Sequence, residues 1–100
     1  MCQIPLCLPR FFQEYENHGI TFWGLTAQNE PEDGNIPGFT FNCMGWNATT
    51  QRIFVAENLG PSLEQAGYGD LKLMILDDQR LFAPGWCQEV NLNRIVNIAI

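Results

Sequence analysis

Two apolar runs that each end in polar residues constrain the fold of this chain more than any other feature. The run ITFWGLTA, residues 20–27, shows no polar alternation and leads into Gln-Asn-Glu-Pro, which contains Asn29 and Glu30. The run LMIL, residues 73–76, ends in Asp-Asp-Gln at 77–79. Strands without alternation are typical of parallel sheets covered on both faces. The sequence therefore predicts two buried parallel strands with polar side chains at their C-terminal ends.

Helical patterns precede and separate these two runs. Residues 10–18 place aromatic side chains at helical spacing, and Gly19 stands where a helix C-cap is expected. Residues 48–67 carry an apolar stripe. Asn47 is the predicted N-cap of this second helix, and Pro61 is expected to end or bend it.

The remaining segments are predicted to be loops. Residues 31–46 hold two prolines and three glycines, which indicates a long irregular loop, and their aromatic side chains argue against disorder. Residues 81–90 begin a further loop and a helix. The alternation of helix and buried strand predicts an α/β architecture. In such folds functional groups gather at the C-terminal ends of the strands, so Glu30 and residues 77–79 are expected to share one rim.

The composition is that of a protein interior. The chain has 100 residues, enough for one small domain, of which 46% are hydrophobic and only 16% charged. Small proteins have the largest surface relative to volume, so this low charge indicates a part of a larger core. We expect Trp23, Trp46 and Trp86 to pack in that core and not to stack on a sugar.

Charge and apolar length exclude several classes of function. Five Lys and Arg against eleven Asp and Glu give a net charge of −6, so the sequence predicts no nucleic-acid partner. No apolar run approaches the ~20 residues of a membrane span. The beginning of the chain, MCQIPLCLPR, does not have the pattern of a signal peptide. Neither strand is followed by a glycine-rich phosphate-binding motif, which disfavours a nucleotide.

The cysteine pattern gives no indication of a metal. The four cysteines are Cys2, Cys7, Cys43 and Cys87, without a CxxC pair, and His18 is the only histidine. The sequence therefore predicts neither a metal site nor a cofactor. Cys2 and Cys7 are spaced so that they can pair in an oxidising compartment, but free thiols are an equally good interpretation.

Four motifs in order along the chain resemble the lysosomal glucosylceramidases of glycoside hydrolase family 30. They are the Asn-Glu-Pro that ends the first strand, GFTFNCMGW, QRIFVAENLGPSL and LKLMILDDQRLFAPGW. The resemblance covers residues 10–90 and leaves residues 1–9 and 91–100 as non-matching tails. It implies a fragment of a (β/α)8 TIM barrel that contains strands four and five.

The resemblance also implies roles for individual residues. Glu30 is the implied proton donor and later the base, and Asn29 is implied to bind the 2-hydroxyl of the glucosyl group. Gln79 is implied to line the rim, while Phe39 and Phe41 fall where the family has a loop over the entrance. A carboxylic acid that donates a proton needs a raised pKa, and we expect the surrounding aromatic side chains to supply the apolar setting that raises it.

The implied reaction is hydrolysis of the β-glucosidic bond of glucosylceramide, in the lysosome and as part of sphingolipid metabolism. A retaining glycosidase needs a second carboxylate, the nucleophile, about 5–5.5 Å from the acid. The resemblance places that glutamate on strand seven, beyond residue 100, so this chain is expected to carry only the acid/base half and to be inactive alone. The alternative is a non-catalytic α/β piece that self-associates or binds a partner. In the full-length family, association with a membrane surface is also implied.

Other polar residues have structural interpretations. Asn47-Ala48-Thr49 is an N-glycosylation sequon, which matters only in the secretory pathway and is compatible with the N-cap role of Asn47. Asp77 and Asp78 are expected to be loop or capping acids and not catalytic ones. Uncovered apolar faces lead us to expect that the isolated chain is oligomeric, insoluble or partly unfolded.

Overall fold

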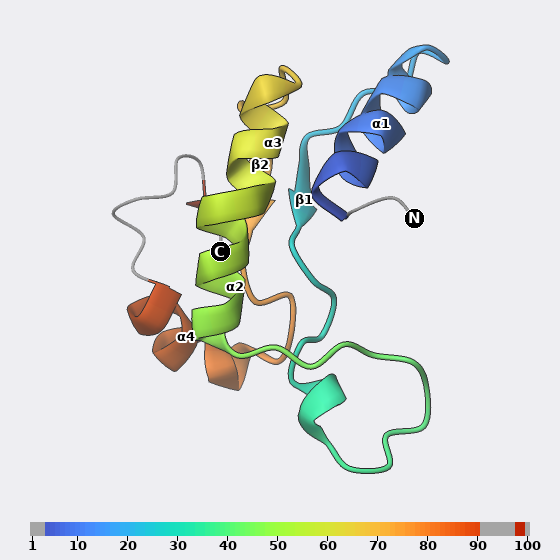
Figure 1. Cartoon of the computed structure of the whole chain (residues 1–100). Coiled ribbons are helices and arrows are strands. Elements are labelled where there is room, and N and C mark those ends of the chain that lie inside the picture. The colour runs from blue at the N-terminus through green and yellow to red at the C-terminus, as the bar shows by residue number, and fades with distance from the viewer. Residues whose placement is uncertain (1–3, 91–97, 100) are drawn as a thin grey trace.

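Three parallel strands and the helices that pack beside them make up the structure (Figure 1). The computed structural model describes residues 4–90 and 98–99, and side chains within residues 6–90. The elements, in chain order, are α1 (Ile4–Glu16), β1 (Gly24–Thr26), α2 (Ala48–Phe54), α3 (Gly60–Gln65), β2 (Lys72–Met74), α4 (Ala83–Val90) and β3 (Ile98–Ala99), with short 3-10 turns at Asp33–Asn35 and Arg80–Phe82 and a π turn at Val55–Leu59.

The sheet confirms the predicted parallel pair and adds a strand. β1 pairs in parallel with β2, with Leu25 opposite Leu73, and β2 pairs in parallel with β3, which gives the order β1-β2-β3. The sequence predicted no strand at β3. Both predicted strands are shorter than expected, three residues each. After β2, the backbone turns to positive φ at Leu76 and Asp77, so this strand cannot continue through them.

Helix α1 begins six residues earlier than predicted. Its start at Ile4 places Pro9 inside the second turn, where the missing N–H removes one helical hydrogen bond while the fixed φ of proline still suits a helix. The predicted C-cap at Gly19 is confirmed. Gly19 has φ +78°, and its N–H and that of Ile20 donate to the carbonyls of Glu16 and Tyr15, which is the Schellman pattern.

The second predicted helix is continuous through α2, the π turn and α3. Asn47 is its N-cap, as predicted, because the Asn47 side chain accepts from the Thr50 N–H at 2.8 Å. Pro61 does not end the helix. The Gly60 N–H bonds to the carbonyl of Val55, five residues back, and this wider turn leaves room for a proline ring that would crowd the carbonyl of an ordinary α turn.

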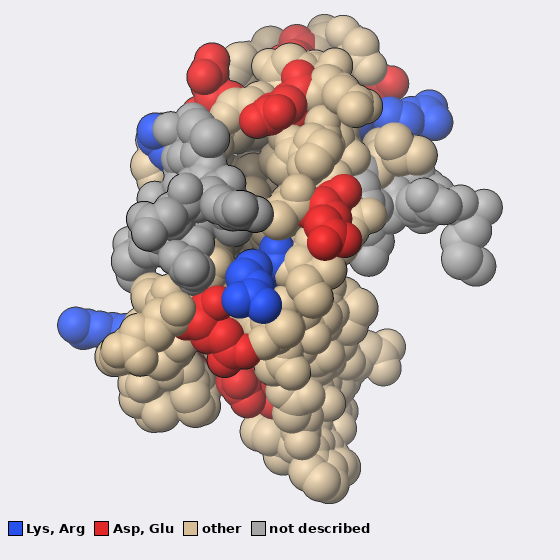
Figure 2. All heavy atoms as spheres, turned by 60° about the vertical axis from the view of Figure 1, so that its left-hand side comes forward, with Lys and Arg blue, Asp and Glu red and all other residues tan. Residues whose placement is uncertain are grey.

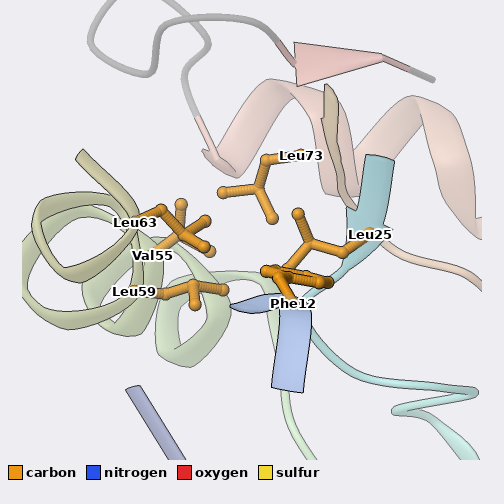
Figure 3. Packing of buried hydrophobic residues seen from close by; sticks show 6 residues of the cluster. All are labelled: Phe12, Leu25, Val55, Leu59, Leu63 and Leu73. Carbon is orange, nitrogen blue, oxygen red and sulfur yellow. The ribbon is translucent and has the colours of Figure 1, made fainter. Parts of the chain in front are cut away.

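One face of the sheet packs against the helices (Figure 3). Leu25 and Leu73, which are paired across β1 and β2, point toward the helical layer. Thr26 and Met74 are the next pair, so they face the other side of the sheet and are only half-buried. The core cluster consists of Phe12, Leu25, Val55, Leu59, Leu63 and Leu73.

The apolar runs predicted strands that are buried on both faces. Among the described residues, only the face toward the helices is buried. Of the tryptophans predicted to lie in the core, Trp86 is buried, in a second cluster with Ile75 and Leu76. Trp46 is half-buried, and Trp23 is 69% exposed, so the prediction for Trp23 was wrong. The apolar run around Trp23 indicates that this side chain is suited to a buried position, but no described part of the chain covers it.

Among the described residues on the face shown in Figure 2, basic side chains lie apart from one another, while several acidic side chains form a row below the central basic one. Within the described part of the chain, no helix is long and apolar enough to cross a membrane. Cys43 and Cys87 are free thiols and Cys7 is disulfide-bonded, while Cys2, the partner considered from the sequence, lies outside the described residues.

Candidate active site

The ends of β1 and β2 hold three strained residues. Glu30, Leu76 and Asp77 have φ of 42°, 68° and 57°, and they are the non-glycine residues with positive φ in the described structure. Such a conformation costs roughly 1–3 kcal/mol per residue and persists only where surrounding contacts enforce it. Strain of this kind is concentrated at functional sites, so the rim formed by these residues is a candidate functional site.

Hydrogen bonds across the rim hold the two strand ends together. The Glu30 N–H donates to the Asp77 carbonyl at 2.9 Å, and the Thr26 hydroxyl donates to the Asp77 carboxylate at 2.8 Å. The Glu32 N–H donates to the Asp78 carboxylate at 3.0 Å. The predicted shared rim is therefore confirmed, and both aspartates have the structural roles expected of them.

The loop of residues 31–46 leaves the rim and returns to it. At its neck the Trp46 N–H donates to the Pro31 carbonyl at 3.1 Å. The backbones at Gly34 and Gly45 touch so closely that a Cβ on Gly34 would lie 2.0 Å from the Gly45 nitrogen. Two glycines are therefore required at the neck, where the two ends of the loop meet.

This loop and the end of β1 enclose an open hollow with a volume of about 420 Å³. Glu30 is half-buried there and Asn29 is exposed, so the structure brings these two predicted residues together. Phe41 and Met44 form an apolar wall and are 58% and 41% exposed.

The other predicted residues lie apart from this hollow. Phe39 does not line it but packs edge-on against Phe41, with ring centroids 4.7 Å apart. Gln79 is exposed and lines neither this hollow nor a second one of about 240 Å³ between Thr26, Asp78 and Arg80.

Neighbouring carboxylates raise the pKa of the Glu30 carboxyl above its ordinary value. The charge of Asp33 contributes most, followed by desolvation, a side-chain hydrogen bond with Asp33 and the charges of Asp78 and Asp77. A raised pKa was expected from an apolar setting of aromatic side chains. Desolvation does contribute, but the charge of Asp33 is the larger cause. The sequence contained a signal for Asp33: Glu-Pro-Glu-Asp is a turn sequence, and the Asp33 N–H indeed donates to the Glu30 carbonyl at 3.1 Å.

Asn47 lies at the start of α2, away from the residues that line the hollow. Its side chain is exposed, as attachment of a glycan requires, and its oxygen also accepts from the Thr50 hydroxyl at 2.9 Å. The hydroxyl of Thr49, the third sequon residue, donates to the carboxylate of Glu89. Glycosylation of Asn47 stays a prediction. Within the described residues, no group of three or more His, Cys, Asp or Glu side chains is arranged to hold a metal ion.

Comparisons with known proteins place this geometry in a family context. The model of the glycosyl hydrolase family 30 TIM-barrel domain matches residues 6–96. The chain is 42% identical over 81 residues to the lysosomal acid glucosylceramidase of Mus musculus, and the match covers 81% of this chain and 16% of that protein. Putative glucosylceramidase 3 of Caenorhabditis elegans is 43% identical over 82 residues, with 81% of this chain and 16% of the relative covered. The chain thus spans 16% of the length of these relatives.

Solved structures agree on the fold. The crystal structure of SrfJ from Salmonella typhimurium matches with a TM-score of 0.73 at 23% identity, covering 91% of this chain and 21% of that one. The endo-beta1,6-glucanase BT3312 matches with a TM-score of 0.65 at 19% identity, covering 95% of this chain and 23% of that one. At these identities the likeness shows the fold alone.

Proposed function

This chain belongs to glycosyl hydrolase family 30, a family of TIM-barrel domains, and on that premise we propose that residues 10–90 form the acid/base part of a glucosylceramidase. One observation carries the proposal. Glu30 follows the C-terminal end of a parallel strand, its backbone N–H is bonded to the neighbouring strand end, and nearby acids raise the pKa of its carboxyl. This is the position at which TIM-barrel enzymes hold catalytic groups.

In the proposed reaction, Glu30 acts first as an acid and then as a base. The protonated carboxyl donates to the glycosidic oxygen while the nucleophilic glutamate of strand seven attacks the sugar and the carbon–oxygen bond to ceramide breaks. The Glu30 carboxylate then removes a proton from a water molecule that attacks the anomeric carbon. The bond between the sugar and the nucleophilic glutamate breaks, and glucose is released. A raised pKa favours the protonated form that the first step needs. Asn29 lines the same hollow and is assigned the glucosyl 2-hydroxyl, while Gln79 is assigned to the rim.

The mixed chemistry of the hollow supports the proposed substrate class. Glucosylceramide joins a polar sugar to two hydrocarbon chains, and the hollow is lined by Glu30 and Asn29 together with the exposed apolar side chains of Phe41 and Met44. The lysosomal name of the mouse relative favours a lysosomal location and a place in sphingolipid metabolism. Action at a membrane surface is consistent with the exposed apolar wall.

A chimera tests this proposal directly. Residues 10–90 of this chain would replace the matching segment of the mouse relative, which supplies the rest of the barrel and the nucleophile. We expect the chimera to hydrolyse a fluorogenic β-glucoside and glucosylceramide. A folded chimera, with a melting transition near that of the mouse protein but no turnover of either substrate, would contradict the proposal.

In this chimera, Asp33→Asn is expected to move the basic limb of the pH profile to lower pH. Glu30 acts as an acid only while protonated, so kcat/KM falls as the pH rises through the Glu30 pKa. The charge of Asp33 is the largest cause of the raised pKa, so its removal lowers that pKa. Asp70→Asn, at an exposed acid before β2, is the matched control and should leave the profile in place. A basic limb that stays fixed in Asp33→Asn would show that another group controls it.

A further inference from the structure

Gln51 on α2 is a polar side chain at the centre of the molecule. It is completely buried, and its side-chain oxygen accepts two hydrogen bonds, from the Leu76 N–H at 3.0 Å and from the Trp86 indole N–H at 2.7 Å. These donors belong to the turn after β2 and to α4, so one amide oxygen joins three elements. Burying an amide is costly unless its partners are fixed, which gives this residue more than a space-filling role.

The geometry also fixes which way the amide points. Both donors are N–H groups, so only the oxygen of Gln51 can face them, and the opposite orientation would set the amide nitrogen against two donors. The Gln51 nitrogen has no hydrogen-bond partner among the described residues. The accepting oxygen is therefore the part of the side chain that the fold uses.

The bond to Leu76 reaches Glu30 through the backbone. Leu76 and Asp77 are consecutive left-handed residues, and the Gln51 oxygen holds the N–H at the first of them. The turn they form aims the Asp77 carbonyl at the Glu30 N–H, which it accepts at 2.9 Å. The backbone of Glu30 is itself in the left-handed conformation, which surrounding contacts must enforce. The direction of the Glu30 side chain therefore depends on this hydrogen bond.

We propose that Gln51 is a positioning residue: its side-chain oxygen holds the Leu76–Asp77 turn, which sets the backbone of Glu30 and thereby directs the acid/base carboxyl. This inference rests on the proposed function of Glu30. Gln51 touches neither the substrate hollow nor Glu30, so it acts only through the turn. A displacement of a catalytic group by about 1 Å can lower the rate by about 10²-fold, so the contact has a measurable consequence.

The test is Gln51→Met in the chimera, which keeps the length and shape of the side chain and removes the acceptor. A β-glucoside with a poor leaving group needs the Glu30 proton, whereas dinitrophenyl β-glucoside with azide as the acceptor needs neither acid nor base. We expect kcat for the poor leaving group to fall roughly 10- to 100-fold, with little change for dinitrophenyl glucoside with azide. Gln51→Glu, which retains an acceptor oxygen, should restore most of the loss at acid pH, where its carboxyl is protonated. Gln65→Met, at an exposed glutamine of α3, is the matched control.

Equal loss with both substrates would overturn the proposal, because Gln51 would then support the fold and not the carboxyl. Unchanged kcat in a folded Gln51→Met chimera would overturn it as well. If that variant does not fold, Gln51→Asn, which withdraws the oxygen by one methylene, should show the same selective loss, and failure of both to turn over any substrate would make the residue purely structural. The proposed function fails separately, if Glu30→Gln itself shows no selective loss.

Discussion

Glu30→Gln in the chimera is expected to lower the turnover of glucosylceramide by about 10²- to 10⁴-fold, the usual contribution of a general acid/base. Glutamine keeps the size and polarity of the side chain but has no proton to give to the leaving alkoxide. The backbone contact from the Glu30 N–H to the Asp77 carbonyl does not involve the side chain, so the rim should keep its shape. The measurement is kcat with natural and fluorogenic substrates, compared with the unmodified chimera.

The leaving group gives this prediction its specificity. Loss of an acid should depend strongly on how much the departing oxygen needs a proton, and loss of a merely structural glutamate should not. Glu57→Gln, at an exposed glutamate of the π turn, is the matched control and should retain full activity. An equal loss for all leaving groups in Glu30→Gln would remove Glu30 from the role of proton donor.

The second large effect concerns the 100-residue chain by itself, which we expect to be inactive and to self-associate. The proposed reaction needs a nucleophile from strand seven of the barrel. On the sheet face away from the helices, Thr26 and Met74 are only half-buried. Just before β1, Trp23 exposes 69% of its surface. β1 is also an edge strand, with backbone groups that can pair with another copy.

Light scattering should therefore give a mass well above the 11.4 kDa of one chain. Trp23→Lys places a charge on the exposed site without touching the core cluster, so it should reduce the association. Turnover of a β-glucoside is expected to be undetectable in the 100-residue chain and in its Trp23→Lys variant. A monodisperse 11.4 kDa species with a cooperative melt would contradict the expected self-association.

The parallel pairing of the strands was predictable because it depends on unbroken apolar runs, which are a local feature of the sequence. The strand ends were not, because Leu76 and Asp77 adopt left-handed conformations that no local signal favours. Contacts from elsewhere in the chain impose those conformations, among them the Gln51 oxygen on Leu76 and the Thr26 hydroxyl on Asp77. The early start of α1 was missed for the opposite reason: Pro9 is a local helix-breaking signal, yet α1 includes it at the cost of one helical hydrogen bond.

The candidate site also contains residues that the sequence indicated and residues that it did not. Glu30 and Asn29 were found because they form a short motif at a strand end, and the structure places both in one hollow. The largest cause of the raised pKa was overlooked, although the turn sequence Glu-Pro-Glu-Asp is a local signal that brings Asp33 back toward Glu30. Gln51 was not singled out at all, because a glutamine in a helical pattern carries no sign of being buried.

The most direct test of the account is azide rescue of the Glu30→Gln chimera with dinitrophenyl β-glucoside. This substrate forms the glycosyl-enzyme without an acid, and the intermediate then waits for a base that the variant lacks. Azide is a nucleophile that needs no base, so it should accelerate turnover and yield β-glucosyl azide, with the configuration of the substrate retained. No acceleration by azide, or an α-glucosyl azide product, would contradict the assignment of Glu30 as the acid/base carboxyl.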